Sequence, residues 1–189
     1  MEKNKLRDQD IALLALELVV PLVVGDILDG HEAYDEVAEY TLHEMIGEMA
    51  PDTALLCLSL SAGVVARHYR DIPLCGALTK ETDRIIEDYA TLWIANKNRT
   101  ASISDAEIRD LLVYIPEDLE AIADLLDAAQ PSIMRQNDTA GIVCELLSLQ
   151  AQAHSEAAQI RLEEINLPVL SRGTGRAADN VILFPGKRG

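Results

Sequence analysis

The chain has 189 residues, of which 49% are hydrophobic, so it is long enough and apolar enough to bury a core and does not have the composition of a disordered chain. Aromatic residues make up only 4%, so the core must be aliphatic, and a composition rich in Ala and Leu favours helices over strands. With a formal net charge of −16, the chain lacks the cluster of basic residues that is typical of nucleic-acid-binding proteins. We therefore expect no direct contact with nucleic acid.

The first predicted element is an apolar segment at residues 11–24. It follows three basic residues, as the hydrophobic part of a signal peptide does, but acidic residues intervene and no small-residue cleavage site follows. It is also shorter than the roughly 20 residues that span a bilayer. We therefore expect a core helix, kinked or broken at Pro21, in a cytoplasmic protein that does not enter a membrane.

The second predicted element is an amphipathic helix at residues 32–49, because its apolar residues recur at alternating spacings of three and one. Its other face is acidic, and residues 8–66 contain no Lys or Arg. An acidic surface of this kind suits a basic protein partner. We expect four carboxylates of this helix to take part in partner binding: Glu32, Asp35, Glu36 and Glu39.

One row on this helix has the residue types of a metal site. Asp35, Glu39 and His43 follow one another at a spacing of four, and carboxylates and imidazole are the ligands of di-iron and zinc bundles. However, the di-metal pattern needs Glu-x-x-His pointing into the core, whereas this row lies opposite the apolar stripe. We therefore expect a solvent-exposed face, no metal and no cofactor, and we keep a helical-bundle metalloenzyme as an alternative.

Further helices are predicted at residues 53–69, 79–96, 105–115, 116–129 and 138–166. Thr79 is the expected N-cap of the second of these, after a loop at residues 71–76. Ser104 and Glu107 form a capping box, and Pro116 suits the first position of the next helix. The last helix is the longest, and we expect its weakly apolar second half to project from the body and to pair with another chain, giving a homo-oligomer such as a dimer.

The cysteines and the isolated histidines of the chain show no pattern of a catalytic or metal site, so we expect structural roles for them. Cys57, Cys75 and Cys144 are odd in number, far apart and flanked by apolar residues, so we expect buried thiols in a reducing compartment. His154, like the other isolated histidines, is expected at the surface or in a cap. The chain has neither a Gly-x-Ser-x-Gly motif nor a phosphate loop after a strand. We therefore expect no catalytic residue and no enzyme.

Residues 168–189 are predicted to form a basic, extended or disordered tail, separate from an acidic helical domain at residues 1–167. The tail has four basic residues against one acidic residue. It also holds an apolar run with the form of a linear docking motif, which contains the only Phe of the chain: Asn180, Val181, Ile182, Leu183, Phe184 and Pro185. Leu183-Phe184 resembles the end of the short peptide by which bacterial proteins bind the sliding clamp, with Asn180 in place of the expected Gln. The run either docks on a partner or folds back onto its own body or a twin subunit.

The sequence as a whole predicts an all-α protein of six or seven helices, packed as an irregular or orthogonal bundle. We expect a non-enzymatic protein-interaction module, such as a bacterial or phage-type regulator, adaptor or inhibitor. It would act through its acidic helical faces and its C-terminal linear motif. An alternative is an acidic mimic of nucleic acid that inhibits a DNA-binding protein, because carboxylates at helical spacing can imitate a row of phosphates.

Overall fold

The structure, a computed structural model, describes residues 17, 19–20, 32–98 and 105–172, and the side chains of residues 17, 19–20, 40–90 and 109–172. Its helices are α2 (Glu32–Gly47), α3 (Pro51–His68), α4 (Pro73–Asn98), α5 (Asp105–Leu112), α6 (Ile115–Met134) and α7 (Asp138–Glu164). These residues form no strand, which confirms the all-α prediction for the described part of the chain. The total number of helices and the extended C-terminal tail stay predictions.

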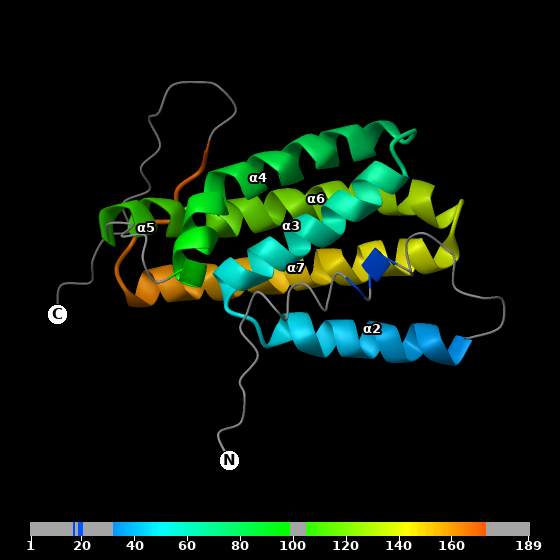
Figure 1. Cartoon of the computed structure of the whole chain (residues 1–189), viewed down its shortest axis with the longest axis horizontal. Helices are drawn as coiled ribbons and strands as arrows, with labels where there is room; N and C mark the ends of the chain where they lie inside the picture. Colours follow the sequence, from blue (N-terminus) through cyan, green and yellow to red (C-terminus); the bar gives the residue numbers. More distant parts are fainter. Residues whose placement is uncertain (1–16, 18, 21–31, 99–104, 173–189) are drawn as a thin grey trace, which may run out of the picture.

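The long helices run roughly along the long axis of the molecule, and successive ones alternate in direction (Figure 1). The antiparallel pair α6 and α7 makes the most extensive contact, α3 packs against α4, α6 and α7, and α2 lies against α7 and α3. The short helix α5 lies at one end of the bundle (Figure 1). The described helices therefore form an up-and-down arrangement, which differs from the orthogonal one of the two packings, irregular or orthogonal, that we expected.

Helix α3 lies in the middle of the bundle because it is apolar nearly all round. Its side chains at Leu55, Leu58 and Val65 have no exposed surface and belong to one hydrophobic core. The hydroxyl of Ser59 donates a hydrogen bond of 2.6 Å to the carbonyl of Leu55 one turn earlier, which satisfies a polar group inside this core. Pro51 begins the helix, at a position where its missing N–H costs nothing.

The three cysteines are buried and free, as predicted from their apolar neighbours. Burial raises the pKa of Cys57 to about 12 and that of Cys144 to about 12, because a thiolate would lose its hydration in the core. Burial also raises the pKa of Cys75. These thiols are therefore protonated at neutral pH and act as small apolar side chains.

Helix α4 begins six residues earlier than we predicted, at Pro73, so the expected loop at residues 71–76 is largely helical. Thr79 is not an N-cap: its hydroxyl donates to the carbonyl of Cys75 inside the helix, at 2.9 Å. Cys75 and Leu78 have no exposed surface, and Ile72 before the helix is 7% exposed. The missed signal was this apolar spacing of three, which begins before the threonine.

Helix α6 continues to Met134 through Pro131, whereas we expected it to end near Ala129. An interior proline costs about 3 kcal/mol through the lost hydrogen bond and the clash with the preceding turn. Pro131 lies on the exposed side of the helix, while Ala129 and Ile133 have no exposed surface. Burial of the last turn against the core therefore offsets the cost of the proline.

Helix α7 begins at Asp138 as predicted, with the side chain of Asn137 accepting a hydrogen bond from the backbone of Ala140. Its second half does not project from the body: Ala158 is 5% exposed and Leu162 is 4% exposed. Most buried residues of this half are small, such as Ala151, Ser155 and Ala158, and a search for large apolar residues overlooks them. No described helix is both long enough and apolar enough to cross a membrane.

Candidate functional site

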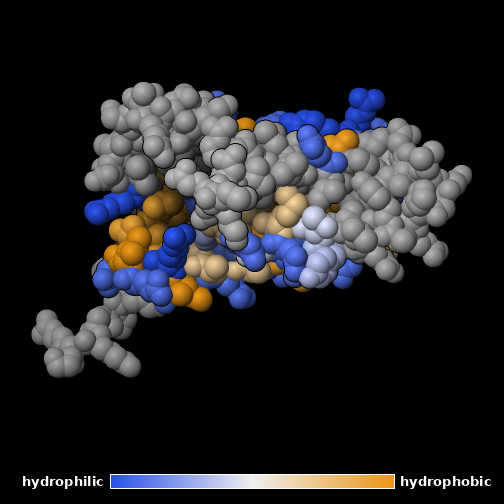
Figure 2. Space-filling view, turned by 60° about the horizontal axis from the view of Figure 1, so that its bottom comes forward, coloured by the Kyte–Doolittle hydropathy of each residue, from blue (hydrophilic) through white to orange (hydrophobic). Residues whose placement is uncertain are grey.

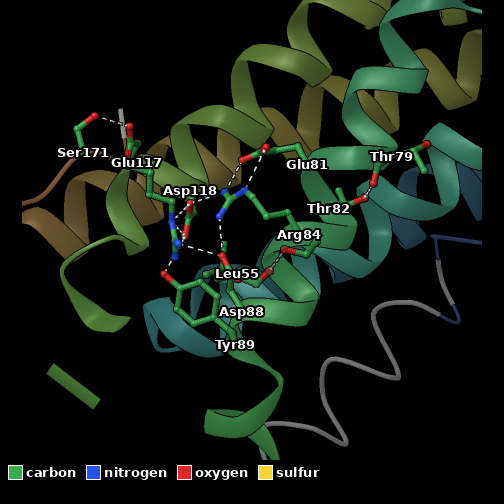
Figure 3. Close-up of polar contacts among 12 residues, drawn as sticks. Leu55, Thr79, Glu81, Thr82, Arg84, Asp88, Tyr89, Glu117, Asp118 and Ser171 are labelled. Carbon is green, nitrogen blue, oxygen red and sulfur yellow. Dashed lines mark hydrogen bonds and ion pairs between the residues drawn. The ribbon is translucent and has the colours of Figure 1, made fainter. Parts of the chain in front are cut away.

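A cluster of charged and aromatic side chains occupies the place where α4 meets the beginning of α6. Glu81, Arg84 and Asp88 follow one another at spacings of three and four on α4, so they share one face of that helix. Glu117 and Asp118 lie in the first turn of α6, where the helix dipole favours acidic side chains. The packing of α4 against α6 brings the two sets together (Figure 3).

Asp118 is the centre of this cluster. Only 1% of its side chain is exposed, and it accepts hydrogen bonds from two other helical residues. Arg84 donates from Nη2 to Oδ1 at 2.6 Å, and the hydroxyl of Tyr89 donates to Oδ2 at 2.8 Å (Figure 3). A buried carboxylate without such partners would be strongly unfavourable, so these donors explain its burial.

The third donor to Asp118 is Arg172, which lies eight residues beyond the end of α7. Its Nε lies 3.1 Å from Oδ1 of Asp118, and its Nη2 lies 3.1 Å from Oδ2, so the guanidinium bridges both oxygens. Its Nη1 lies 2.9 Å from Oδ2 of Asp88. The guanidinium carbon also lies 4.5 Å from the ring centre of Tyr114 and 5.8 Å from that of Tyr89, which are cation–π contacts.

The charges of the cluster stabilise one another. Burial opposes the charges of Arg84 and Arg172, but hydrogen bonds and the nearby carboxylate of Asp118 outweigh it and raise both pKa values. Burial, together with the charge of Asp118, raises the pKa of Tyr89. At neutral pH the tyrosine is therefore a hydrogen-bond donor, and the arginines remain cationic.

This arrangement is suited to holding a guanidinium group. Three carboxylates, those of Glu81, Asp88 and Asp118, contact the two guanidinium groups, and a fourth, that of Glu117, accepts from the backbone of Arg172. The cluster therefore keeps an excess of negative charge with Arg172 in place. Both oxygens of Asp118 already accept hydrogen bonds, so its carboxylate positions cations and is not placed to remove a proton from a substrate. We call the set of Asp88, Tyr114, Glu117 and Asp118 the arginine site.

The arginine site contains none of the residues that we singled out from the sequence for partner binding. Glu32, Asp35, Glu36 and Glu39 belong to α2, but their side chains are outside the described part of the structure. Asn180, Val181, Ile182, Leu183, Phe184 and Pro185 are also outside it. The residues of the arginine site were missed, although Glu117-Asp118 directly after Pro116 was a visible helix start, and Arg172 was counted only as part of the tail charge.

His43, the third member of the row considered as a metal site, is exposed on α2, as the amphipathic pattern predicts. Its Nδ1 lies 2.7 Å from the side-chain nitrogen of Gln150 on α7, so it joins the two helices. Among the residues that the structure describes, no three His, Cys, Asp or Glu side chains lie close enough together to hold a metal ion. The side chains of Asp35 and Glu39 are not among those residues.

A second surface feature lies on α7, where large apolar side chains face solvent. Leu149 is 57% exposed and Ile160 is 59% exposed, and Ile142, two helical turns before Leu149, is 40% exposed. Ile165 and Val169, just beyond the helix, are exposed as well. Figure 2 shows apolar surface at the end of the molecule where α7 finishes. We call Ile142, Leu149 and Ile160 the α7 row.

Comparison of the chain with protein-family models, with curated proteins and with solved structures found no match.

Proposed function

We propose that this protein is a non-enzymatic protein-interaction module, a regulator, adaptor or inhibitor, that binds its partner through the α7 row. The supporting observation is the exposure of three large apolar side chains on one helix face. Separations of seven and eleven residues correspond to two and three helical turns, so Ile142, Leu149 and Ile160 align. They span about 27 Å at 1.5 Å per residue, enough to receive a partner helix.

The charges beside the α7 row favour a basic partner. Glu145, Glu156 and Glu163 are exposed near this row on the same helix. An amphipathic helix with lysines or arginines beside its apolar face would match both the row and these carboxylates. The acidic surface of α2 and the linear motif at residues 180–185 would take part in the same partner binding. The protein would act in the cytoplasm, a reducing compartment that suits its free buried thiols.

Self-association through the same row is the second form of this proposal. In an antiparallel pair of α7 helices, Ile142 of one copy would face Ile160 of the other, and Leu149 would face the small exposed residue Ala153. The acidic residues beside the row would then face one another, so such a dimer would form better at high ionic strength. Among the described residues, no contact favours the nucleic-acid mimic or the metalloenzyme over an interaction module.

The test compares Leu149→Glu with Leu74→Glu, because Leu74 is a 39% exposed leucine on α4, which makes no substantial contact with α7. Each tagged variant is expressed in the native host, and the proteins that purify with it are compared with those of the unchanged chain. We expect Leu149→Glu to lose a captured protein, or a second copy of the chain carrying another tag, that Leu74→Glu retains. Identical capture by both variants would contradict a role for the α7 row.

A further inference from the structure

The first residues beyond α7 bind to the body as a separate peptide would. The backbone N–H of Leu170 donates to the carbonyl of Val113 at 3.0 Å. The hydroxyl of Ser171 donates to one carboxylate oxygen of Glu117 at 2.6 Å, and the backbone N–H of Arg172 donates to the other. An extended chain is thus held by its backbone at two residues, which is a common mode of peptide recognition.

The arginine site recognises one side-chain type. Asp118 contacts two nitrogens of one guanidinium group and Asp88 contacts the third, while the guanidinium carbon lies over the ring of Tyr114. A lysine has a single ammonium group, so it can make neither the bridging contact nor the same stacking. The site therefore distinguishes arginine from lysine, beyond simple attraction of positive charge.

The bound arginine can leave without exposing an unpaired buried charge. If Arg172 departs, Asp118 keeps its hydrogen bonds from Arg84 and Tyr89. The segment that carries Arg172 has much exposed surface, with Ile165 55% and Val169 39% exposed. The bound state of this segment is therefore maintained mainly by the contacts of residues 170–172, and another chain could replace it.

We propose that the arginine site is a binding site for an extended, arginine-bearing segment of a partner protein, which displaces the chain's own residues 170–172. The internal segment acts as a tethered competitor, because its covalent connection gives it a high effective concentration at the site. A partner must then bind a second surface as well, or bind more tightly than the internal segment. The proposal is independent of the α7 row, which lies on another helix.

The test removes the tethered competitor in the full-length chain by Arg172→Ala. A fluorescein-labelled peptide with the sequence of residues 167–173 and blocked ends is added at low ionic strength, and fluorescence anisotropy measures binding. We expect the variant to bind this peptide at least about tenfold more tightly than the unchanged chain does. We also expect the same peptide with lysine in place of arginine to bind at least about tenfold more weakly.

Two further variants locate the binding. Asp118→Asn in the Arg172→Ala chain removes the central charge, and circular dichroism establishes whether this double variant is folded. Tyr114→Leu, also in the Arg172→Ala chain, keeps every carboxylate and removes only the aromatic ring that contacts the arginine. It therefore tests the site even if Asp118→Asn impairs folding. We expect it to bind the peptide about fivefold more weakly than the Arg172→Ala chain does. The proposal is overturned by a folded Arg172→Ala chain that ignores the peptide, or that binds the lysine peptide equally well. The proposal is also overturned if the unchanged chain forms a dimer that dissociates on Arg172→Ala, because the site would then bind a second copy of this chain and not a partner protein.

Discussion

Asp118 and His154 are both buried polar side chains, but their surroundings stabilise opposite states. Asp118 is surrounded by donors, including two guanidinium groups, so its negative charge is compensated. His154 is 6% exposed, and its Nε2 donates to the carbonyl of Ile46 at 2.7 Å. Burial lowers the pKa of His154 below 6.5, and the hydrogen bond to the carbonyl only partly opposes this. His154 is therefore buried in its neutral form, contrary to the surface role that we expected.

The buried state of His154 makes stability depend on pH. The unfolded chain takes up a proton at this residue near pH 6.5, while the folded chain does so only at lower pH. The contribution of neutral His154 is therefore fully present above pH 6.5 and is lost as the pH falls from 6.5 through the lowered pKa of the folded state. We expect the free energy of unfolding, measured in urea by circular dichroism, to decrease between pH 7.5 and pH 5.5.

Two substitutions separate this effect from the titration of other groups. His154→Gln retains an N–H donor for the carbonyl of Ile46 but does not titrate, so its stability should change less between the two pH values. His68→Gln, which removes an exposed histidine at the end of α3, is the control for losing a histidine outside the core. An unaltered slope in His154→Gln would show that other groups cause the decrease.

At the scale of the helices, Gly141 sets the separation of α6 and α7. A Cβ at this position would lie 2.5 Å from the Cβ of Met134 and 2.8 Å from its Cα. The second of these is a backbone atom, so rotation of a side chain cannot relieve the overlap. We expect Gly141→Ala to lower the free energy of unfolding by up to about 2 kcal/mol, because an overpacking cost of about 1–3 kcal/mol outweighs the gain in helix propensity of about 1 kcal/mol. Urea denaturation measures the difference.

Gly76 provides the matched control, since it is also a helical glycine, on α4, and no atom lies within 4 Å of the Cβ that alanine would add. Gly76→Ala gains helix propensity without a clash and should raise the free energy of unfolding by up to about 1 kcal/mol. The two substitutions should therefore have opposite signs. If both stabilise the chain, the helices can separate at Met134 and the contact does not set their distance.

Local sequence patterns predicted the helix boundaries well where a strong local signal marked them, and poorly where tertiary contacts determine where a helix begins or ends. Pro116 and Asp138 were predicted helix starts that the structure contains to within one residue. Pro131 was misread because burial of its neighbours Ala129 and Ile133, which a local pattern does not show, keeps it inside a helix. Thr79 was misread because the apolar spacing of three before it was overlooked. The long second half of α7 was misread because its small buried residues give little hydrophobic signal.

The arginine site was beyond sequence reasoning for a different reason. The donors to Asp118 are 29, 34 and 54 residues away in the chain, so no periodicity connects them. Only the stacking of α4 on α6, and the return of the chain after α7, bring Tyr89, Arg84 and Arg172 to one carboxylate. The charge of each residue was visible, but its partner was not.

At the scale of the whole molecule, the net charge of −16 opposes compact folding through mutual repulsion, while the ion pairs around Asp118 attract over short distances. Raising NaCl from about 10 mM to about 150 mM shortens the screening length from about 30 Å to about 8 Å. This change screens the many distant repulsions more than the few buried attractions, so we expect the melting temperature to rise by a few degrees. Differential scanning calorimetry measures the shift, and KCl should give the same result as NaCl. A fall in the melting temperature would mean that ion pairs such as those of Asp118, and not the overall acidity, dominate the electrostatics of the folded protein.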